Sequence, residues 1–507
     1  MIRWEAILRE NLWWRLIKNN MTKNKEKFYI ATSIAYTNSL PHIGYALELI
    51  QADVVARYNR LLGKDVWFLT GTDEHGSKIV RKAEEEGKLP QEFCDEISAK
   101  FKELKTVLDL SFDDFIRTTD QKRHWPTVQA IWKILQAKGD LQKRKYKGLY
   151  CVGCEAFVTQ RDLADGKCPL HNKEPEIVEE ENYFFKLSRY QNQLKEILEN
   201  NEIKIFPAGR KNEMLNFIKE GLEDVSCSRD SQILSWGVPV PGDDSQRIYV
   251  WFEALINYLS ALGYLTADDE KFQKYWPCNV HFIGKDIARF HVLLWPAMLL
   301  GLELALPKNI FIHGFITAEG QKMSKSLGNV IDPFLLVEKY GTDPVRYFLL
   351  REISPTEDGD FSYEKFEERY NADLANGIGN LLARVVTLAS KISTGVILSQ
   401  QAKNPAYTNP NFQMKIAQTK NDYSKFLDEF SFNEALGVIW ELISFCDKYV
   451  NDNKPWEGGE NALSVIGDLL LALQEIAELL KPFMPQTAEK ISEQIASNKS
   501  EPLFPRI

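Results

Sequence analysis

The chain has 507 residues, a formal net charge of −9, 44% hydrophobic residues and 26% charged residues. These proportions are those of an ordinary globular protein, and the length is too great for one hydrophobic core, so several domains are expected. The negative total excludes a chain that is basic over its whole surface, so any nucleic-acid site must be a local patch. No apolar run reaches the length of about 18 residues that a membrane span requires. The seven cysteines, an odd number, favour reduced thiols in the cytoplasm over a disulfide framework.

The first segment precedes any predicted strand or helix. Residues 1–20 carry three tryptophans among basic and apolar residues, and Met21 begins a stretch that reads like an ordinary protein start. We expect residues 1–27 to form a disordered extension. A helix lying on a membrane surface is the alternative interpretation.

A buried strand and a helix are predicted next, joined by a Pro-His-x-Gly sequence. Residues 28–34 form a short apolar and β-branched run, and apolar residues follow at helical spacing from Ala46. Between them lie Pro41, His42 and Gly44. A helix N-terminus attracts anions, a glycine lets a ligand approach the backbone, and an imidazole can donate to a phosphate oxygen. Alone the pattern is weak, because a single histidine more often has a structural role.

Polar residues follow the second predicted strand, residues 66–70. The sequence GTDEHG, residues 71–76, comes directly after it. Open α/β sheets bind ligands at the carboxyl ends of their strands, although a capped turn before the next helix explains the same residues. Helical patterns at 77–86, 92–108 and 125–138 continue an alternation of strands and helices. This alternation predicts an α/β fold with a doubly wound parallel sheet.

Four potential metal ligands then occur in two pairs: Cys151 and Cys154, followed after 13 residues by Cys168 and His171. Two knuckles of this spacing suit a tetrahedral Zn²⁺ ion, and four protein ligands close its coordination shell, so the metal would be structural. The surrounding residues, 139–247, show short strands and turns. We expect them to form an insertion between two halves of the sheet, stabilised by the metal. Unrelated reduced thiols are the alternative interpretation.

The predicted sheet resumes at residues 248–255 and continues with strands at 280–283 and 309–316. The last strand leads into a loop, residues 320–329, that contains the sequence KMSKS. Two lysines three residues apart in a loop of small residues can neutralise an anionic ligand as mobile point charges. For any KxxK loop a solvated turn is the commoner explanation, but the five-residue string is much rarer.

From about residue 371 the pattern becomes all-helical, which predicts a helical bundle. Helices fit residues 376–392, 430–451 and 462–480, and the polar residues 399–411 read as a loop. Asn380 and Arg384 lie four residues apart on the first of these helices and therefore share a face. Trp456 follows Pro455 at the end of the second helix. An arginine and an indole can splay and stack single-stranded bases. A domain that only packs against its neighbours explains the same pattern.

The Pro-His-x-Gly and KMSKS sequences together resemble the HIGH and KMSKS signatures of class I aminoacyl-tRNA synthetases. With the cysteine pairs, GTDEHG, residues 250–254 (VWFEA) and residues 284–286 (GKD), residues 28 to the end resemble the bacterial methionyl-tRNA synthetases. The chain departs from the first signature at Tyr45, where the family has its second histidine. The resemblance implies a Rossmann-like α/β catalytic domain with a zinc-bearing insertion, followed by an all-α anticodon-binding bundle.

The resemblance also implies a role for individual residues. The catalytic residues would be His42, Lys322 and Lys325. ATP would be bound by Pro41, His42, Gly44, Tyr45, Gly284, Asp286, Lys322, Met323, Ser324, Lys325 and Ser326. Methionine would be bound by Ile34, Asp73, Trp251, Ala254, Leu255, Tyr258, Ile287, Phe290, His291 and Trp295. The tRNA anticodon would be read by Asn380, Arg384 and Trp456, and structural zinc held by Cys151, Cys154, Cys168 and His171.

These assignments divide the chain into six segments and name its partners. The segments are the extension (1–27), the first catalytic half (28–138), the zinc-knuckle insertion (139–247), the second catalytic half with the KMSKS loop (248–330), a connecting module (331–370) and the helical anticodon-binding domain (371–507). We expect a cytoplasmic monomer that binds L-methionine, ATP with Mg²⁺, and initiator and elongator tRNA-Met. Two alternatives stay open: a class I synthetase for another small amino acid such as cysteine, and a tRNA-binding paralogue whose catalysis is weakened by Tyr45.

Overall fold

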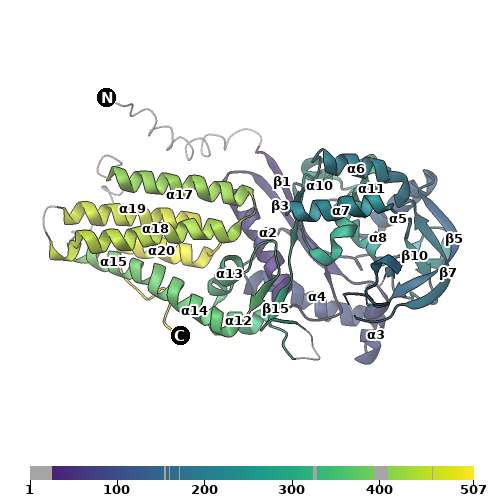
Figure 1. Cartoon of the computed structure of the whole chain (residues 1–507), viewed down its shortest axis with the longest axis horizontal. Helices are drawn as coiled ribbons and strands as arrows, with labels where there is room; N and C mark the ends of the chain where they lie inside the picture. Colours follow the sequence, from purple (N-terminus) through teal and green to yellow (C-terminus); the bar gives the residue numbers. More distant parts are fainter. Residues whose placement is uncertain are drawn as a thin grey trace.

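The computed structural model describes residues 25–153, 156–158, 160–170, 172–323, 328–392, 409–458 and 461–507. A parallel sheet lies at its centre, with a bundle of helices at one end and antiparallel strands at the other (Figure 1). The strands of the sheet follow the order β2-β3-β1-β13-β14-β8, and β4 pairs with β3. They are β1 (Lys27–Thr32), β2 (Ala35–Tyr36), β3 (Asp65–Asp73), β4 (Asp114–Arg117), β8 (Lys204–Phe206), β13 (Val280–Gly284) and β14 (Asn309–His313).

The central strand β1 is where the order of the sheet reverses. Ile30 pairs in parallel register with Phe68 of β3 on one side and with Val280 of β13 on the other. The chain passes from β1 through a helix to β3, and the strands on the other side of β1, which are β8, β13 and β14, all come later in the sequence. In sheets of this kind, ligands bind outside the carboxyl ends of the strands beside such a reversal.

Helices cover both faces of this sheet. The side chains of its strands therefore enter two separate cores, one on each face. Ile30 belongs to one core, whereas its neighbours Tyr29 and Ala31 belong to the other. This alternation is the period of a strand buried on both faces. The helices of the catalytic part are α2 (Ile43–Leu61), α3 (Ser77–Glu85), α4 (Pro90–Val107), α5 (Trp125–Ala137), α8 (Val250–Leu255), α9 (Asn257–Ser260), α10 (Glu270–Tyr275) and α11 (Trp295–Gly301).

Two small antiparallel sheets interrupt the parallel sheet. The first, of four strands, comprises β5 (Leu141–Cys151), β6 (Ala156–Val158), β7 (Glu176–Phe185) and β9 (Val225–Ser226). The second, of three strands, comprises β10 (Ser228–Asp230), β11 (Pro239–Val240) and β12 (Asp243–Ile248). These strands occupy the insertion predicted from the sequence, which is drawn at the far end from the bundle in Figure 1.

One part of residues 139–247 does not fit the expected pattern of short strands and turns. Two helices, α6 (Gln191–Glu199) and α7 (Ala208–Glu220), flank β8, and β8 pairs in parallel with β14 at the edge of the central sheet. The chain therefore re-enters the catalytic sheet in the middle of the predicted insertion. A three-residue strand, KIF, is too short to give an alternating pattern that predicts it.

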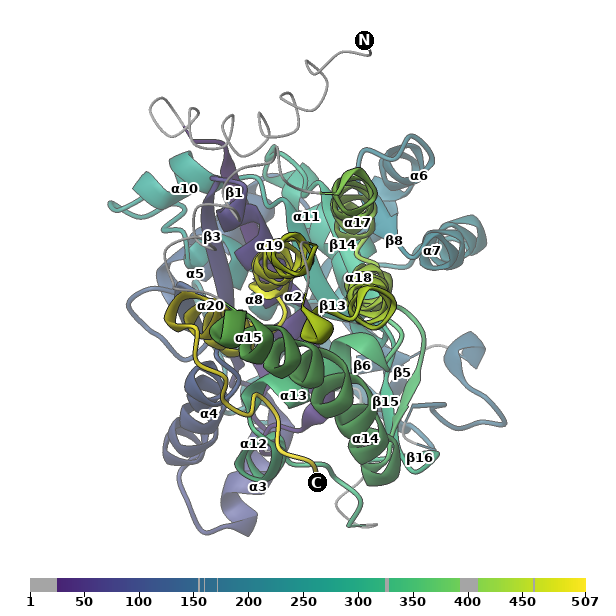
Figure 2. The same ribbon diagram turned by 90° about the vertical axis from the view of Figure 1, so that its left-hand side faces the viewer.

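A connecting segment and the helical bundle complete the fold. The connection contains a three-stranded sheet of β15 (Ile316–Ala318), β16 (Gln321–Lys322) and β17 (Gly359–Phe361), and the helices α12 (Pro333–Tyr340), α13 (Thr342–Arg351) and α14 (Tyr363–Arg369). The bundle, seen end-on in Figure 2, contains α15 (Asn380–Ile392), α17 (Pro410–Asp428), α18 (Phe432–Asn453), α19 (Ala462–Leu480) and α20 (Pro485–Ser497). The sequence patterns predict α15, α18 and α19, but they do not predict α17 or α20.

The bundle is fused to the catalytic part rather than tethered to it. Phe430 lies in the turn between α17 and α18. Its ring packs on Phe311 of β14 and on Phe206 of β8, with centroid distances of 5.3 and 5.0 Å. The buried guanidinium of Arg346 on α13 donates to the Phe483 carbonyl at 2.7 Å and pairs with Asp53 of α2 at 2.8 Å. A single hydrophobic core therefore continues from the sheet into the bundle.

The predicted combination of a parallel-sheet α/β part followed by an all-helical part is confirmed. In the part of the chain that the structure describes, no helix is long and apolar enough to cross a membrane.

Candidate active site

His42 caps the N-terminus of helix α2 with one of its two ring nitrogens. It is the N-cap residue, with extended backbone angles, and its Nδ1 accepts a hydrogen bond from the Gly44 amide at 3.1 Å. Burial lowers the pKa of His42, so the ring is neutral at pH 7. Because Nδ1 accepts, the proton resides on Nε2. His42 therefore offers an N–H donor beside a helix N-terminus, the arrangement that binds a phosphate oxygen.

Met323, in the KMSKS sequence, lies against the same helix N-terminus. A Cβ atom added to Gly44 would lie 2.9 Å from Cε1 of His42 and 3.9 Å from Cε of Met323. The glycine therefore keeps open a narrow space between the two signature sequences. Bulk at this position would displace the imidazole, which explains why the sequence has no side chain there.

Asp286 joins this cluster from the carboxyl end of β13. Its Oδ1 lies 2.7 Å from the position of a Cβ on Gly284, so that glycine also permits a close approach. Desolvation raises the pKa of Asp286, and the charges of His313 and Lys322 partly oppose the rise. The structure thus gathers His42, Gly44, Met323, Asp286 and Lys322, which are all predicted ATP ligands.

Lys322 also contacts the predicted zinc knuckle. Its Nζ donates to the Leu170 carbonyl at 3.0 Å, between the positions of Cys168 and His171. Three further predicted ATP ligands, Ser324, Lys325 and Ser326, lie outside the described residues. The structure therefore places the first lysine of the signature and not the second.

Tyr45 forms contacts between the ends of two neighbouring strands, β1 and β3. Its hydroxyl lies 3.1 Å from Thr70 Oγ1 and donates to the carbonyls of Ser33 and Gly71 at 3.4 Å. Its ring packs edge-on against Phe101 at 5.2 Å. Burial raises the pKa of Tyr45, so the hydroxyl stays protonated. Tyr45 thus joins the ends of β1 and β3. Pro41, another predicted ATP ligand, is buried just before helix α2.

The predicted methionine ligands gather beside this cluster. Trp251 of α8 stacks on Phe290, with centroids 4.3 Å apart and planes 5° from parallel. Ile34, Ile287 and Phe290 are half-buried and pack on the core. The buried members are Ala254, Leu255, Tyr258, His291 and Trp295. An aromatic wall over an apolar floor suits a flexible thioether side chain, because sulfur makes favourable contacts with ring edges.

Tyr258 and His291 are hydrogen-bonded to each other inside this floor. Burial lowers the pKa of His291 to about 4, so its ring is neutral at pH 7. Its Nδ1 donates to the Ile287 carbonyl at 3.1 Å, which leaves Nε2 to accept the Tyr258 hydroxyl proton at 2.8 Å. Both protons are engaged, so neither residue has one available for a substrate sulfur in this arrangement.

Asp73 lies at the carboxyl edge that the other residues share. It is the last residue of β3, it is 4% exposed, and its main-chain oxygen accepts from the Thr37 amide at 3.0 Å. Ile34 follows the adjacent strand β1. A buried carboxylate in this position can pair with a substrate ammonium group.

Sequence patterns missed two buried glutamate–histidine groups next to these residues. Glu48 of α2 accepts from His313 Nε2 at 2.8 Å and from the Ser33 amide at 2.9 Å. Glu253 of α8 lies 2.7 Å from His75 and 2.7 Å from a second histidine, His124. His75 and His313 stand at or just after strand ends, which is a usable signal, whereas nothing in the sequence marks the glutamates as their partners.

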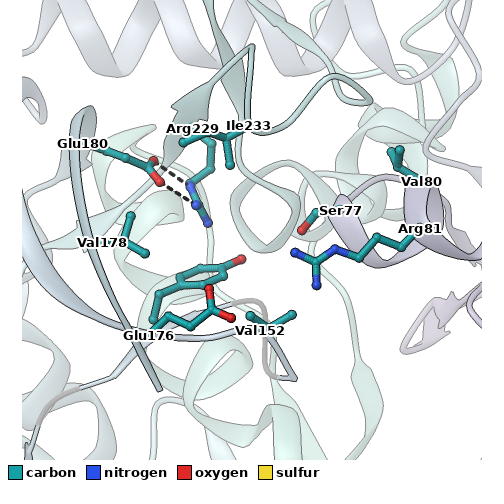
Figure 3. A pocket seen from close by; sticks show the side chains of 10 residues that line it. Ser77, Val80, Arg81, Val152, Glu176, Val178, Glu180, Arg229 and Ile233 are labelled. Atoms are coloured by element: carbon teal, nitrogen blue, oxygen red, sulfur yellow. Dashed lines mark hydrogen bonds and ion pairs between the residues drawn. The ribbon is translucent and has the colours of Figure 1, made fainter. Parts of the chain in front are cut away.

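A cavity of about 330 Å³ lies between α3 and the antiparallel strands (Figure 3). Arg229 forms a two-pronged ion pair with Glu180 on its wall, at 2.6 and 2.8 Å, and Arg81 points into it from α3. Among the predicted ligand residues that the structure describes, none lines this cavity. The cavity begins at Ser77, directly after GTDEHG, and no sequence motif predicts it.

The three predicted anticodon residues share one region of the bundle. Arg384 of α15 donates to Asn451 Oδ1 at 2.9 Å, and its guanidinium lies 5.8 Å from the ring centroid of Trp456. Trp456 is 50% exposed and Asn380 is also exposed. An exposed indole beside a positive charge can stack on an unpaired base.

The predicted zinc ligands are only partly described. Cys151 ends β5 and Cys168 forms an isolated bridge with Lys173, and both thiols are buried. Cys154 and His171 lie outside the described residues. Among the residues that are described, no group of three or more His, Cys, Asp or Glu side chains could hold a metal ion. Two buried thiols in a small sheet are compatible with thiolate ligands but do not by themselves form the site.

Comparison with family models identifies the class of protein. The model "tRNA synthetases class I (M)" matches residues 28–173 and 158–386, and the model "Anticodon-binding domain of tRNA ligase" matches residues 411–505. The parallel sheet, the histidine at the helix N-terminus and the adjacent lysine loop are thus those of a class I tRNA synthetase.

Individual relatives identify the family within this class of synthetases. The methionine–tRNA ligase of Caldanaerobacter subterraneus is 46% identical over 93% of this chain and 74% of its own length, and that of Brucella suis is 44% identical over 93% and 92%. The solved structure of Mycobacterium tuberculosis methionyl-tRNA synthetase in complex with methionyl-adenylate has a TM-score of 0.85 and 36% identity, and the match covers 95% of this chain and 100% of that one. The chain belongs to the methionyl-tRNA synthetase family.

Proposed function

We propose that the residues gathered at the carboxyl ends of β1, β3 and β13 carry out the first step of methionine–tRNA ligation. In that step the methionine carboxylate oxygen forms a bond to the α-phosphorus of ATP, and the bond to the leaving pyrophosphate breaks. The observation that carries the proposal is the approach of Met323 to Gly44 and His42. It brings the start of the KMSKS sequence next to a helix N-terminus, and lysines and helix N-termini both bind phosphate.

Each group at this site has one task. The Nε2–H of His42 and the ammonium groups of Lys322 and Lys325 would hold phosphate oxygens, while Gly44 leaves room for the nucleotide. Gly284 and Asp286 would face the ribose. The Mg²⁺ ion that accompanies ATP supplies further neutralisation of the phosphate charge when bound. The protein then contributes mainly by positioning reactants and stabilising charge.

The amino acid would lie between Asp73 and the stacked pair of Trp251 and Phe290. The Asp73 carboxylate would pair with the ammonium group, and the rings would enclose the thioether. Such a pocket discriminates against a side chain one methylene shorter by only about 1–3 kcal/mol. The relatives compared are methionine enzymes, which does not favour the cysteine or non-catalytic alternatives.

In the second step, the enzyme transfers methionine from the adenylate to the terminal ribose hydroxyl of tRNA-Met, and AMP leaves. We assign anticodon reading to Asn380, Arg384 and Trp456, supported by the contact of Arg384 with the exposed indole. We further propose a structural zinc ion on Cys151, Cys154, Cys168 and His171, and a cytoplasmic monomer.

Amino-acid-dependent exchange of pyrophosphate into ATP, without tRNA, tests this proposal. Methionine, cysteine, leucine, isoleucine and valine would be compared on the same preparation. We expect exchange with methionine alone, which would also show that Tyr45 is compatible with activity. Exchange with another amino acid would retain the class and reject the pocket assignment. A folded protein that binds tRNA and exchanges with none of the five would be the non-catalytic paralogue.

A further inference from the structure

Three buried side chains form a hydrogen-bonded group behind the proposed methionine pocket. Glu253 Oε1 lies 2.7 Å from His75 Nδ1, and Glu253 Oε2 lies 2.7 Å from His124 Nε2. His75 is 1% exposed, and Glu253 and His124 are 0% exposed. His124 Nδ1 lies 2.8 Å from Ser260 Oγ of α9. The two carboxylate oxygens of Glu253 therefore bind two histidines from different parts of the chain.

Glu253 is charged although it is buried. Desolvation acts to raise the pKa of Glu253, but the interactions with His75 and His124 outweigh it, so the pKa is lowered and the carboxylate is ionised. Facing an ionised carboxylate, both histidine nitrogens must donate. A buried carboxylate is strongly destabilising unless its oxygens are satisfied, and a satisfied network fixes its partners in one arrangement.

The positions of these residues in the chain link the two sides of the pocket. Glu253 stands on α8 between Trp251 and Ala254, while His75 follows Asp73 by two residues. The helix α8 has only six residues, too few to hold its own orientation without tertiary contacts. The bond between His75 and Glu253 therefore joins the element with the proposed ammonium ligand to the element with the aromatic wall.

His75 makes no other polar side-chain contact in the described part of the chain. Its Nε2 is buried and has no hydrogen-bond partner there, and its ring packs beside Trp236 and Trp125 at centroid distances of 5.5 and 6.0 Å. A histidine that served only to fill space in such aromatic surroundings would be replaceable by an apolar ring. Its one specific contact is the bond to Glu253.

We propose that Glu253 is a positioning residue for the amino-acid pocket, acting through His75 to fix the distance between Asp73 and Trp251. The inference rests on the proposed function, in which those two residues bind methionine. It concerns methionine affinity and leaves the nucleotide site untouched, because the group contacts none of those proposed ATP ligands that the structure describes. A change at Glu253 should therefore weaken the binding of methionine and leave the binding of ATP unchanged.

Kinetics of pyrophosphate exchange on paired variants test this inference. We expect Glu253→Gln to raise the KM for methionine about tenfold with the KM for ATP unchanged, because its NH₂ group opposes one histidine donor and the pocket wall shifts. His75→Phe should have the same effect. His75→Asn should restore a KM near that of the wild type, because its amide nitrogen can take the place of Nδ1.

A matched control separates positioning from general loss of stability. Asp468 is an equally buried carboxylate in the bundle, where it accepts from the Tyr449 hydroxyl at 2.9 Å. Asp468→Asn should lower the melting temperature with the KM for methionine unchanged. If Glu253→Gln does not fold, the comparison of His75→Phe with His75→Asn decides the question.

The outcomes distinguish the inference from the proposed function. Wild-type protein without methionine-dependent exchange would overturn the proposed function and this inference with it. An active wild type together with an unchanged KM for methionine in Glu253→Gln, or equal effects on methionine and ATP, would overturn the inference alone. Equal KM values for His75→Phe and His75→Asn would also overturn it.

Discussion

His42 has two separable roles, because its two ring nitrogens face different partners. Nδ1 caps helix α2, whereas Nε2–H is the donor that we propose for a phosphate oxygen. Asparagine is as good an N-cap residue but has no donor in the place of Nε2. We expect His42→Asn to slow adenylate formation about 10²-fold, as loss of one preorganised donor does, with little change in stability. Single-turnover adenylate formation and urea unfolding would measure the two effects; an unchanged rate would remove His42 from the mechanism.

His291 should make the stability of the protein depend on pH. Burial lowers its pKa to about 4 from an ordinary value of 6.5. Between these values the unfolded chain binds more protons than the folded chain, so stability is complete above pH 6.5 and is lost as the pH falls toward 4. The contribution of His291 is about 3 kcal/mol. Urea unfolding at several pH values should show a shallower decline for His291→Gln than for the wild type, and equal slopes would contradict the assignment.

Individual site residues could be predicted from the sequence only where they belong to a motif. His42, Gly44 and Lys322 stand in short rare strings, and the structure brings them together. Glu253 and His75 also stand in signature sequences, VWFEA and GTDEHG, but their pairing joins segments 178 residues apart in the chain. Such a long-range pairing leaves no local pattern, so it is visible only after folding.

At the scale of elements, the strength of the local apolar pattern separates the helices that the sequence predicts from those that it does not predict. α19 has apolar residues over most of its length, and its predicted range equals the observed Ala462–Leu480. α17 carries a narrower stripe of Phe412, Ile416, Tyr423 and Leu427 among polar residues. That stripe has helical spacing, and the prolines before it favoured a loop. The strand β8 is recognised only by its pairing with β14.

The knuckle between β5 and β7 is an element whose order should depend on metal. Lys322 Nζ donates to the Leu170 carbonyl inside it, so the proposed zinc site and the lysine loop are in contact. We expect zinc removal by a chelator to lower the rate of pyrophosphate exchange while the bundle stays folded, because only the small insertion lacks a sufficient core. Metal analysis, circular dichroism and exchange assays on one sample would measure this. Metal-free protein with the full exchange rate would reject the proposed role.

At the scale of the whole molecule, the bundle and the sheet form one body. Arg346 is fully buried and joins α2 to the segment between α19 and α20 through Asp53 and the carbonyls of Pro482 and Phe483. The aromatic contacts of Phe430 with the sheet reinforce the junction. The bundle can therefore hold a bound RNA in a fixed orientation relative to the catalytic edge, which a flexible linker would not do.

The separation of the two sites within this body predicts a separation of their kinetic effects. Trp456 is half-exposed just after the end of α18 in the bundle, whereas the proposed methionine and ATP ligands belong to the catalytic part. We expect Trp456→Ala to raise the KM for tRNA in aminoacylation by about tenfold to a hundredfold, since stacking on one base contributes about 1–3 kcal/mol. Pyrophosphate exchange without tRNA should keep its wild-type rate, because the indole contacts nothing at the sheet edge. Trp456→Phe, which keeps an aromatic face, should recover most of the tRNA affinity. Impaired exchange in Trp456→Ala would show that the bundle acts on activation as well as on tRNA binding.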